Sequence, residues 1–583
     1  MERRSVCSRI PLPCRSEASS SIFGRSSKLW CRPRPARRVE VEVTDTVKVN
    51  IDGQEIEVPK GMNVIEAAKK VGVEIPHYCY HSHLSVAGNC RMCTVEIEGM
   101  RGLPIACNTG CTDGMVVHTD TEKVKDTRAA VLEFLLLNHP IDCPICDQAG
   151  ECMLQIYYME HDRQDSRVAL EEKVHKGKAI EVGPRVMLDQ ERCIACARCV
   201  RFCDEITKTG ELRLLNRSNH TTIDTFPGIE LDNDYSVCTA DICPVGALTN
   251  KDFRFKARVW FLQHDDEICP GCATGCNVVL DHYEQIELED WNGVAYRLRP
   301  RINDDVNQAW MCDHGRLEYH KVNDDRLDRP IAHNVEVSWE GALTNLRKVL
   351  TPLADEKGAV AGIASYDCTN EEIWLFKKLL KEAFGTEGVA LIPQRADGPE
   401  DDFLIDADKH PNRAGCQLVA GDDLIEGEAV ADYLEGRKAV IVLDADPRSA
   451  VQAASLRDAY SAVKQKIILT PAKNASVFDA SFVLPTVSFA EKDGTWVNRQ
   501  GRVQRIRRAI RRSTAAKPAL DVLAELAALA GLQWGEDERE AAAVFEEIAK
   551  DHPRFRGLDY DVIGRLGAPL EDRSAMAKEG GTV

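Results

Sequence analysis

Apolar and polar residues alternate over the first patterned stretch of the chain, "TVKVNIDGQEIEVP" at 46–59. The alternation runs on both sides of an Asp-Gly pair that is typical of tight hairpin turns, so it predicts two antiparallel strands. The residues that follow predict a short helix. Asn63 can cap this helix, Glu66 stands at the capping-box position, and Gly72 can end it.

A different pattern begins near residue 326. The short apolar runs "GAVAGIAS", "KAVIVLDAD" and "QKIILT" have the character of buried strands, and helical patterns separate them. In the helical stretch "TNEEIWLFKKLLKEAFG", Thr369 and Glu372 form a capping-box pair and Gly385 marks the end. Alternating strands and helices predict an α/β domain with a largely parallel sheet.

Between these parts the chain is loop-rich and dense in cysteine, with one clear helical stretch at 123–137. We therefore expect a multidomain protein of α+β and α/β class. The expected divisions are an extension over 1–44, a [2Fe–2S] domain over 45–122, a histidine-ligated cluster domain over 123–180, a CxxCxxC cluster domain over 181–258, a fourth cluster domain over 259–325, and an α/β domain over 326–583.

The first 44 residues are rich in Arg and Ser and poor in acidic residues. This composition fits a transit peptide, and it equally fits an unstructured extension or a misplaced start codon. We favour an unstructured extension or a misplaced start codon over a transit peptide, for a reason that follows from the fourth cysteine group.

Composition and charge exclude two broad classes. The net charge is −19 and the pI is about 5.4, which argues against a nucleic-acid partner because phosphate recognition needs clustered Lys and Arg. No uncharged apolar run approaches the roughly 18 residues that a membrane span requires. Any membrane contact is therefore expected to go through partner chains.

The 23 cysteines are unevenly placed: most fall between 79 and 312, and only Cys368 and Cys416 follow. Disulfide scaffolds are a feature of short secreted chains, so clustered CxxC groups in a long chain indicate metal chemistry in a reducing compartment.

The first group is Cys79, Cys90, Cys93 and Cys107. A CxxC pair followed by a distant cysteine resembles the plant-type [2Fe–2S] pattern, although the first gap is longer. Structural zinc is the alternative, but zinc prefers paired CxxC knuckles. Together with the strands and helix before it, this group predicts a small ferredoxin module. Cys111 is surplus.

The second group is His139, Cys143, Cys146 and Cys152, in "NHPIDCPICDQAGEC". Three cysteines and one histidine also describe a structural zinc site, and taken alone that is the safer interpretation. Histidine ligation of an iron–sulfur centre is rarer, with Rieske centres as the known case.

The third group is Cys193, Cys196 and Cys199 in "CIACARCVRFC", with Cys243 in "CPVGAL". C-x2-C-x2-C with a remote cysteine before proline is typical of bacterial [4Fe–4S] ferredoxins. Two further cysteines nearby have no complete motif of their own and are interpreted as surplus thiols: Cys203 and Cys238.

The fourth group is Cys269, Cys272 and Cys276 in "CPGCATGC", with Cys312 in "MCDHGR". A zinc ribbon would normally have two CxxC pairs, so a [4Fe–4S] cage is favoured. Four ligand sets in one chain suit one-electron carriers in series better than four structural zinc sites. On that ground the second group is also interpreted as a [4Fe–4S] site.

The order of these motifs resembles the iron–sulfur G subunit of the proton-pumping NADH:quinone oxidoreductases, respiratory complex I. The stretches that carry the resemblance are "CYHSHLSVAGNCRMCTVEIEG", "NHPIDCPICDQAGEC", "RCIACARCVRFC", "CPVGALTNK", "CPGCATGCNV" and "MCDHGR". Further on, "VLPTVSFAEKDGTWVNRQGRVQR" is similar to the tail signature of molybdopterin-oxidoreductase-like domains.

The resemblance implies one [2Fe–2S] and three [4Fe–4S] clusters on the four ligand sets, no catalytic side chain, and an N-terminal β-grasp ferredoxin-like domain. It implies a flavin- and NADH-binding partner subunit, quinone-linking partner subunits, and a peripheral place on the cytoplasmic side of the bacterial inner membrane. The fourth cluster is typical of some bacterial relatives, and this is why we discount a transit peptide.

Two relatives share these motifs. NAD-linked formate dehydrogenases continue into a molybdenum domain, and iron hydrogenases into a cysteine-rich active-site domain. The tract after Cys312 is short for the first and poor in cysteine for the second, so we expect a rear domain with no molybdopterin and interpret Cys368 as a buried thiol. The basic run "NRQGRVQRIRRAIRR" is either a solvated face or a partner contact.

Overall fold

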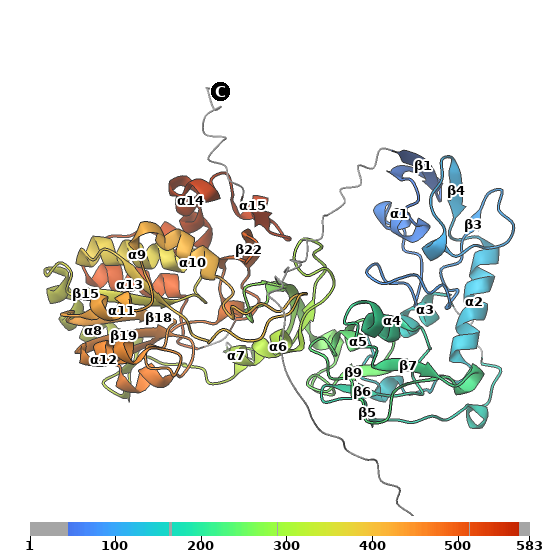
Figure 1. Ribbon diagram of the computed structural model, residues 1–583, viewed down its shortest axis with the longest axis horizontal. Helices are drawn as coiled ribbons and strands as arrows, with labels where there is room; N and C mark the ends of the chain where they lie inside the picture. The colour runs from blue at the N-terminus through green and yellow to red at the C-terminus, as the bar shows by residue number, and fades with distance from the viewer. Residues whose placement is uncertain (1–44, 162–165, 288–289, 512–513, 571–583) are drawn as a thin grey trace, which may run out of the picture.

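The structure is a computed structural model that describes residues 45–161, 166–287, 290–511 and 514–570. The expectation for residues 1–44 lies outside this part of the chain. Figure 1 shows the cysteine-rich modules and the α/β domain as two lobes, with α6 and α7 (Asp313–Arg316 and His320–Asn323) between them. Within the described ranges, no helix is long and apolar enough to cross a membrane.

The first module is a four-stranded mixed sheet with a helix against it. The expected hairpin forms, β1 also pairs in parallel with β4, and β4 pairs with β3. The side chain of Asn63 caps the helix by accepting the Glu66 backbone N–H at 2.9 Å, and Gly72 follows the helix at φ 75°. The elements are β1 (Thr46–Ile51), β2 (Gln54–Pro59), α1 (Val64–Lys70), β3 (Glu96–Ile97) and β4 (Met115–His118).

The second and third modules have little regular structure, as expected from their sequence. The helix predicted over 123–137 is α2, and a short three-stranded sheet and a hairpin surround α4 and α5. The elements are α2 (Glu122–Leu136), α3 (Met153–His161), β5 (Ile180–Glu181), β6 (Val186–Leu188), α4 (Arg198–Glu205), β7 (Leu212–Leu215), β8 (Thr222–Thr225), α5 (Cys238–Asp241) and β9 (Leu248–Asn250).

A three-stranded antiparallel sheet connects the front modules to the rear domain. Its strands are β10 (Gln263–Ile268), β11 (Asn277–Glu287) and β12 (Asp290–Pro300). The cysteine loop of the fourth group joins β10 to β11, so the sheet fixes both ends of that loop.

The rear domain is built on an eight-stranded sheet in the order β14-β13-β20-β19-β18-β15-β16-β17, in which β20 to β17 pair in parallel. The strands are β13 (Ile331–Ala332), β14 (Val335–Glu336), β15 (Val360–Ser365), β16 (Val389–Ile392), β17 (Leu424–Ile425), β18 (Ala439–Leu443), β19 (Gln465–Thr470) and β20 (Phe482–Pro485). The three predicted strand runs are β15, β18 and β19, so the α/β prediction is confirmed.

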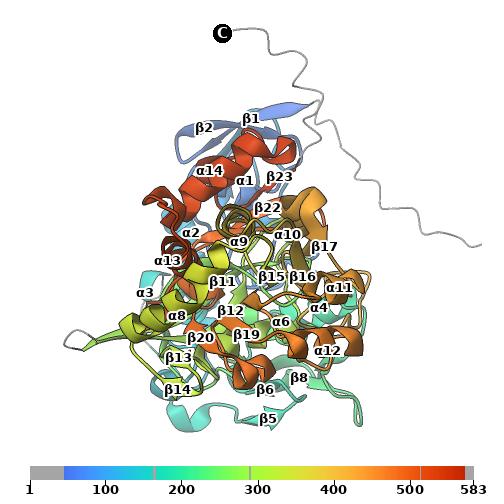
Figure 2. The same ribbon diagram turned by 90° about the vertical axis from the view of Figure 1, so that its left-hand side faces the viewer.

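Helices cover both faces of this sheet, with α8, α9 and α13 on one side and α11 and α12 on the other (Figure 2). Successive strand residues point to opposite faces: Ile441 packs under α9, while Val440 packs toward α12. The helices are α8 (Trp339–Ala354), α9 (Asn370–Phe384), α10 (Arg413–Ala420), α11 (Ala429–Leu434), α12 (Ala454–Ala462), α13 (Ala519–Leu529), α14 (Ala541–Asp551) and α15 (Tyr560–Ile563). The predicted capping box of Thr369 and Glu372 forms, and Gly385 ends α9 at φ 56°.

A last small sheet packs the rear domain against the fourth cysteine module. Its strands are β21 (Gly494–Val497), β22 (Arg502–Ile506) and β23 (Ala568–Pro569). The described part of the basic run includes β22; Arg499 before the strand pairs with Asp406 at 2.9 Å, and Arg502 in the strand pairs with Asp305 at 2.7 Å. Part of its charge is therefore paired within the chain.

Candidate metal centres

The first ligand set lies in the loops between α1 and β4. Its thiols form two close pairs, Cys79 with Cys90 and Cys93 with Cys107. Hydrogen bonding within the first pair lowers the pKa of Cys79 to about 5 and raises that of Cys90. A hydrogen bond within the second pair likewise lowers the pKa of Cys93 and raises that of Cys107. Two thiol pairs match the demand of a [2Fe–2S] cluster for two thiolates on each iron.

The third ligand set surrounds a small cavity that Cys193, Cys196, Cys199 and Cys243 all line. The loop turns tightly because Ala195 and Ala197 have positive φ, 53° and 59°, and α4 then carries Cys199 into the cavity. Apart from Arg198, the rest of the lining is apolar: Leu188, Ile194, Ile223, Val245, Ala247 and Leu248.

Burial sets the protonation of this third set. It raises the pKa of Cys193 to about 11 and that of Cys196 to about 12, and it raises the pKa of Cys199 well above its ordinary value. These groups are therefore thiols when no metal faces them, and binding of iron must release their protons.

In the fourth ligand set, the sulfurs of Cys269 and Cys312 both lie close to Gly315. Cys269 and Cys276 close the loop by a backbone hydrogen bond of 2.9 Å, and Cys312 caps α6 through its sulfur, which accepts the Gly315 N–H at 3.3 Å. A β-carbon on Gly315 would lie 2.8 Å from the sulfur of Cys269 and 3.4 Å from that of Cys312. The glycine leaves space beside these sulfurs, and Cys272 completes the set from within the loop.

The second ligand set is the most open of the four. His139, Cys143 and Cys152 line a common cavity, and Cys143 is exposed. Cys146 does not line that cavity, although it lies close enough to Cys143 and Cys152 to interact electrostatically with both. Burial, with Arg192 and Lys173 nearby, lowers the pKa of His139 to about 4, so the imidazole is neutral at pH 7 and able to bind metal.

Two arginines on α4 join the first and third sets. The guanidinium of Arg198 donates to the carbonyl of Tyr80, which follows Cys79, and to that of Ile242 at 3.1 Å, just before Cys243. Arg201, one turn further on, donates to the carbonyl of Cys79 itself. A buried positive charge thus lies between two groups of thiols.

The loop after Cys243 joins the third and second sets. The carbonyl of Pro244 accepts the Met153 N–H at 3.0 Å and lies 3.8 Å from the sulfur of Cys152. Gly246 in the same loop lies against the sulfur of Cys146. The third set is therefore adjacent to both the first and the second.

Trp310 lies between the first and fourth sets, two residues before Cys312. Its ring stacks on His81 at 5.3 Å between centroids and packs on Phe202 of α4 at 4.8 Å. The fourth set thus contacts the rest of the cysteine-rich part through an aromatic side chain.

The surplus thiols are buried. Cys203 and Cys238 lie in the core around α4 and α5, where Cys238 donates to the carbonyl of Met311 at 3.2 Å and accepts from Arg316 at 3.4 Å. Cys111 lies in the core of the first module, and Cys368 and Cys416 lie in the core of the α/β domain. Within the ranges that the structure describes, no three His, Cys, Asp or Glu side chains converge closely enough to hold a single metal ion.

Sequence reasoning proposed the ligand sets but did not single out the residues between them. Arg198 and Arg201 are visible in "CARCVRFC" as two basic side chains inside a buried cysteine motif, which is the signal that could have drawn attention to them. Gly246 and Gly315 each follow a ligand cysteine by three residues, and only the structure shows what they avoid.

Four family models match parts of the chain. They are a 2Fe-2S iron-sulfur cluster binding domain over 44–122, the NADH-ubiquinone oxidoreductase-G iron-sulfur binding region over 128–167, the ferredoxin-like domain of NADH-quinone oxidoreductase subunit 3 over 183–249, and molybdopterin oxidoreductase over 475–529.

Similar whole proteins carry related names. The NADH-quinone oxidoreductase G subunit of Rickettsia conorii is 38% identical over 58% of this chain and 49% of the relative. The NADH-quinone oxidoreductase G subunit 2 of Rhizobium meliloti is 36% identical over 67% of this chain and 46% of the relative. The chain thus spans about half the length of these curated relatives.

Among solved structures, a chain of an NAD+-reducing [NiFe]-hydrogenase in the H2-reduced state is 28% identical, with a TM-score of 0.33, over 36% of this chain and 91% of that chain. The family models and the curated relatives confirm the resemblance drawn from the motifs: the cysteine-rich part of this chain is similar to the G subunit of NADH-quinone oxidoreductase.

Proposed function

We propose that the chain is an electron-transfer subunit of an NADH:quinone oxidoreductase. It would receive electrons from a subunit that binds NADH and FMN and pass them toward quinone, and the whole complex would couple this transfer to proton translocation. The observation that carries the proposal is the adjacency of the ligand sets, since Arg198 joins the first to the third and the Pro244 loop joins the third to the second.

Each ligand set would hold one iron–sulfur cluster, a carrier of single electrons. The [2Fe–2S] ligands would be Cys79, Cys90, Cys93 and Cys107. The ligands of the three [4Fe–4S] clusters would be His139, Cys143, Cys146 and Cys152; then Cys193, Cys196, Cys199 and Cys243; then Cys269, Cys272, Cys276 and Cys312. The cavity of the third set and the space beside Gly315 in the fourth support this assignment.

The chain's own residues would position these ligands and adjust their charge. Arg198 provides a positive charge near four thiolates, which offsets part of the negative charge that iron binding creates. Neutral His139 in place of a thiolate removes one negative charge from the second set. Most of the wall around the third set is apolar, which lowers the local dielectric and strengthens the effect of Arg198 there.

The division into domains is part of the proposal. Boundaries at 45–122, 123–180, 181–258, 259–325 and 326–583 are supported by the separate sheets that begin at β1, β5, β10 and β13, and by α2, which begins at Glu122. The rear domain would have a structural role without a molybdopterin of its own.

The proposed partners are the flavin- and NADH-binding subunit and the quinone-linking subunits. The proposed place is peripheral, on the cytoplasmic side of a bacterial inner membrane, with membrane contact through those partners. The names of the curated relatives, which are subunits of NADH-quinone oxidoreductases, support the proposal of partner subunits.

The alternative is an iron–sulfur subunit of an NAD-linked formate dehydrogenase or a hydrogenase. The two can be distinguished on chain purified without oxygen, with cluster reduction followed by paramagnetic resonance. We expect dithionite to reduce the clusters directly, NADH to reduce them only when a flavin subunit is added, and formate or dihydrogen to have no effect. Reduction of the isolated chain by formate or dihydrogen would favour the alternative.

A further inference from the structure

The rear α/β domain holds the loop that carries the fourth ligand set. The carbonyl of Asp408 accepts the Ala273 N–H at 2.9 Å, and the carbonyl of Ala273 accepts the Arg499 N–H at 2.7 Å. Three more hydrogen bonds join the loop to the domain: Thr274 Oγ1 to the Leu404 carbonyl, Asn498 Nδ2 to the Thr274 carbonyl, and Gln504 Nε2 to the Gly275 carbonyl. These contacts involve neutral groups.

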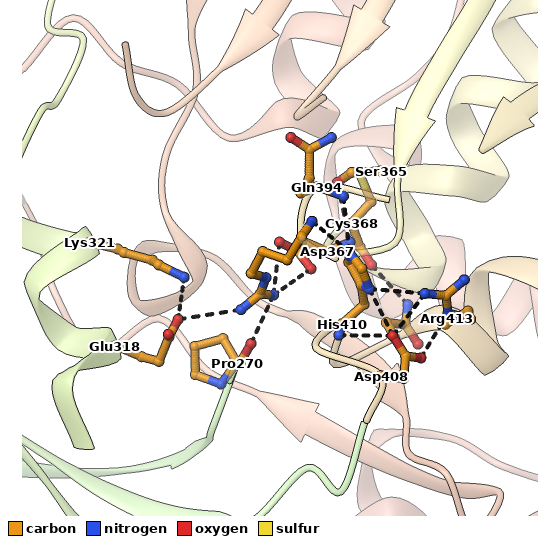
Figure 3. Close-up of polar contacts among 12 residues, drawn as sticks. Pro270, Glu318, Lys321, Ser365, Asp367, Cys368, Gln394, Asp408, His410 and Arg413 are labelled. Carbon is orange, nitrogen blue, oxygen red and sulfur yellow. Dashed lines mark hydrogen bonds and ion pairs between the residues drawn. The ribbon is translucent and has the colours of Figure 1, made fainter. Parts of the chain in front are cut away.

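Arg395 brings a charged side chain to the same loop. It follows β16 at the carboxyl edge of the parallel sheet, and its Nη2 donates to the carbonyl of Pro270 at 3.1 Å. The same nitrogen lies 2.9 and 3.1 Å from the two carboxylate oxygens of Asp367, and Nη1 lies 3.7 Å from Glu318. Figure 3 shows Pro270, Glu318 and Asp367 converging on this point from three segments of the chain.

His410 fixes the backbone that carries Arg395. Its ring is fully buried, and its Nε2 accepts the backbone N–H groups of Gln394 at 2.9 Å and of Arg395 at 3.2 Å. Its Nδ1 lies 2.7 Å from Asp408, whose carboxylate also accepts from Arg413 at 2.8 Å (Figure 3). Because Asp408 binds the cysteine loop through its backbone, one network fixes both the loop and the arginine beside it.

The guanidinium of Arg395 stays charged in this position. Burial alone would lower its pKa, but Asp367, Glu318 and the sulfur of Cys269 raise it. Its Nε–H is buried and has no hydrogen-bond acceptor among the described residues. A fixed cation thus lies beside the first cysteine of the fourth set, and the anion that balances it, Asp367, belongs to the α/β domain.

We propose that Arg395 is a positioning residue through which the α/β domain raises the reduction potential of the fourth cluster. The inference rests on the proposed cluster at Cys269, Cys272, Cys276 and Cys312. Reduction adds one negative charge to a cluster, and a fixed cation nearby stabilises the reduced form. Without Arg395 the cation is lost and the carboxylate of Asp367 is left uncompensated, and both changes lower the potential.

The test is a redox titration of the full chain, purified without oxygen, with the signal of each reduced cluster followed by paramagnetic resonance. The variants are Arg395→Gln, Arg395→Lys, Asp367→Asn and the double variant Arg395→Gln/Asp367→Asn. The matched control is Arg448→Gln, which removes an arginine of the same domain that pairs with Asp479 at 2.6 Å. Iron and sulfide are counted for every sample.

We expect Arg395→Gln to lower the midpoint of the fourth cluster alone, Asp367→Asn to raise it, and the double variant to return it toward the wild-type value. Arg395→Lys, which keeps the charge, should lie closer to the wild type than Arg395→Gln. A fourth-cluster midpoint in Arg395→Gln equal to that of Arg448→Gln would overturn the proposal.

If Arg395→Gln loses the fourth cluster altogether, its midpoint cannot be measured, and Arg395→Lys becomes the deciding variant. Retention of the cluster there, at a midpoint near the wild type, supports the charge role, and loss there as well overturns it. The iron and sulfide content of the unaltered chain reports separately on the proposed function, because a chain without sulfide refutes the clusters before any variant is compared.

Discussion

The sulfur of Cys146 lies 2.3 Å from the point where a β-carbon on Gly246 would stand. Cys146 belongs to the second ligand set, and Gly246 lies three residues after Cys243 of the third. Real β-carbons do not approach a sulfur this closely, so the glycine allows the two sets to be immediate neighbours.

Gly246→Ala should therefore disturb the second cluster. The new methyl group would lie 2.3 Å from the sulfur of Cys146 and 3.1 Å from the β-carbon of Gln148, so the sulfur must move. We expect a loss of iron and of the second cluster's resonance signal, with the first and fourth clusters retained. Gly535→Ala is the control, since a β-carbon there finds only an ordinary contact of 3.6 Å. Equal iron content in both variants would contradict the packing account.

Arg198→Met should affect two clusters at once. It removes a buried cation shared by the first and third sets and leaves the carbonyls of Tyr80 and Ile242 without their donor, at a cost of about 1–3 kcal/mol for each unsatisfied group. We expect a lower melting temperature and lower midpoints for both clusters. The control is Arg213→Gln, which breaks an exposed pair with Asp204 and should change the melting temperature and the two midpoints little. A shift confined to one cluster would show that Arg198 does not bridge them.

His139→Cys should retain a [4Fe–4S] cluster and lower its midpoint, because a thiolate adds the negative charge that the neutral imidazole lacks. The motivation is the H-x3-C-x2-C-x5-C spacing, together with the neutral state of the buried ring. The measurement is a redox titration followed by paramagnetic resonance, with the other three clusters as internal standards. An unchanged midpoint would remove the charge argument.

Glu371 should make stability depend on pH. Burial at the start of α9 raises its pKa to about 7, although Thr495 and Tyr560 donate hydrogen bonds to it. A carboxyl whose folded pKa exceeds its unfolded pKa of about 4.5 contributes stability at low pH, and this contribution is lost as the pH rises through 7. The effect is up to roughly 3 kcal/mol, at 1.36 kcal/mol for each unit of pKa shift.

The measurement is a set of thermal melts of the wild type and Glu371→Gln at pH 5 to 8. We expect the wild type to lose melting temperature relative to the variant as the pH rises across this range. Parallel curves for the two proteins would show that Glu371 does not titrate there.

Local sequence signals predicted the local structure well. The hairpin, the capping box of α9 and the buried strands of the large sheet depend on residues close together in the chain, and all of them form. One local prediction is wrong. Glu66 does not complete a capping box with Asn63; its carboxylate instead accepts from the hydroxyl of Tyr80 and the ammonium of Lys69, each at 2.9 Å.

The four ligand sets are predictions that rest on the spacing of cysteine and histidine residues. Their adjacency could not be predicted, because it depends on contacts between distant residues. Arg198 and Tyr80 are 118 positions apart, and Arg395 and Pro270 are 125 apart. Nothing in the sequence near Cys269 indicates that a cation from the rear domain lies beside it.

Metal analysis of protein purified without oxygen would show whether four iron–sulfur clusters occupy this chain. We expect the fourteen irons that one [2Fe–2S] and three [4Fe–4S] clusters contain, a matching amount of acid-labile sulfide, and no zinc in the four sites. A folded chain that contains zinc and no labile sulfide would contradict the proposed clusters.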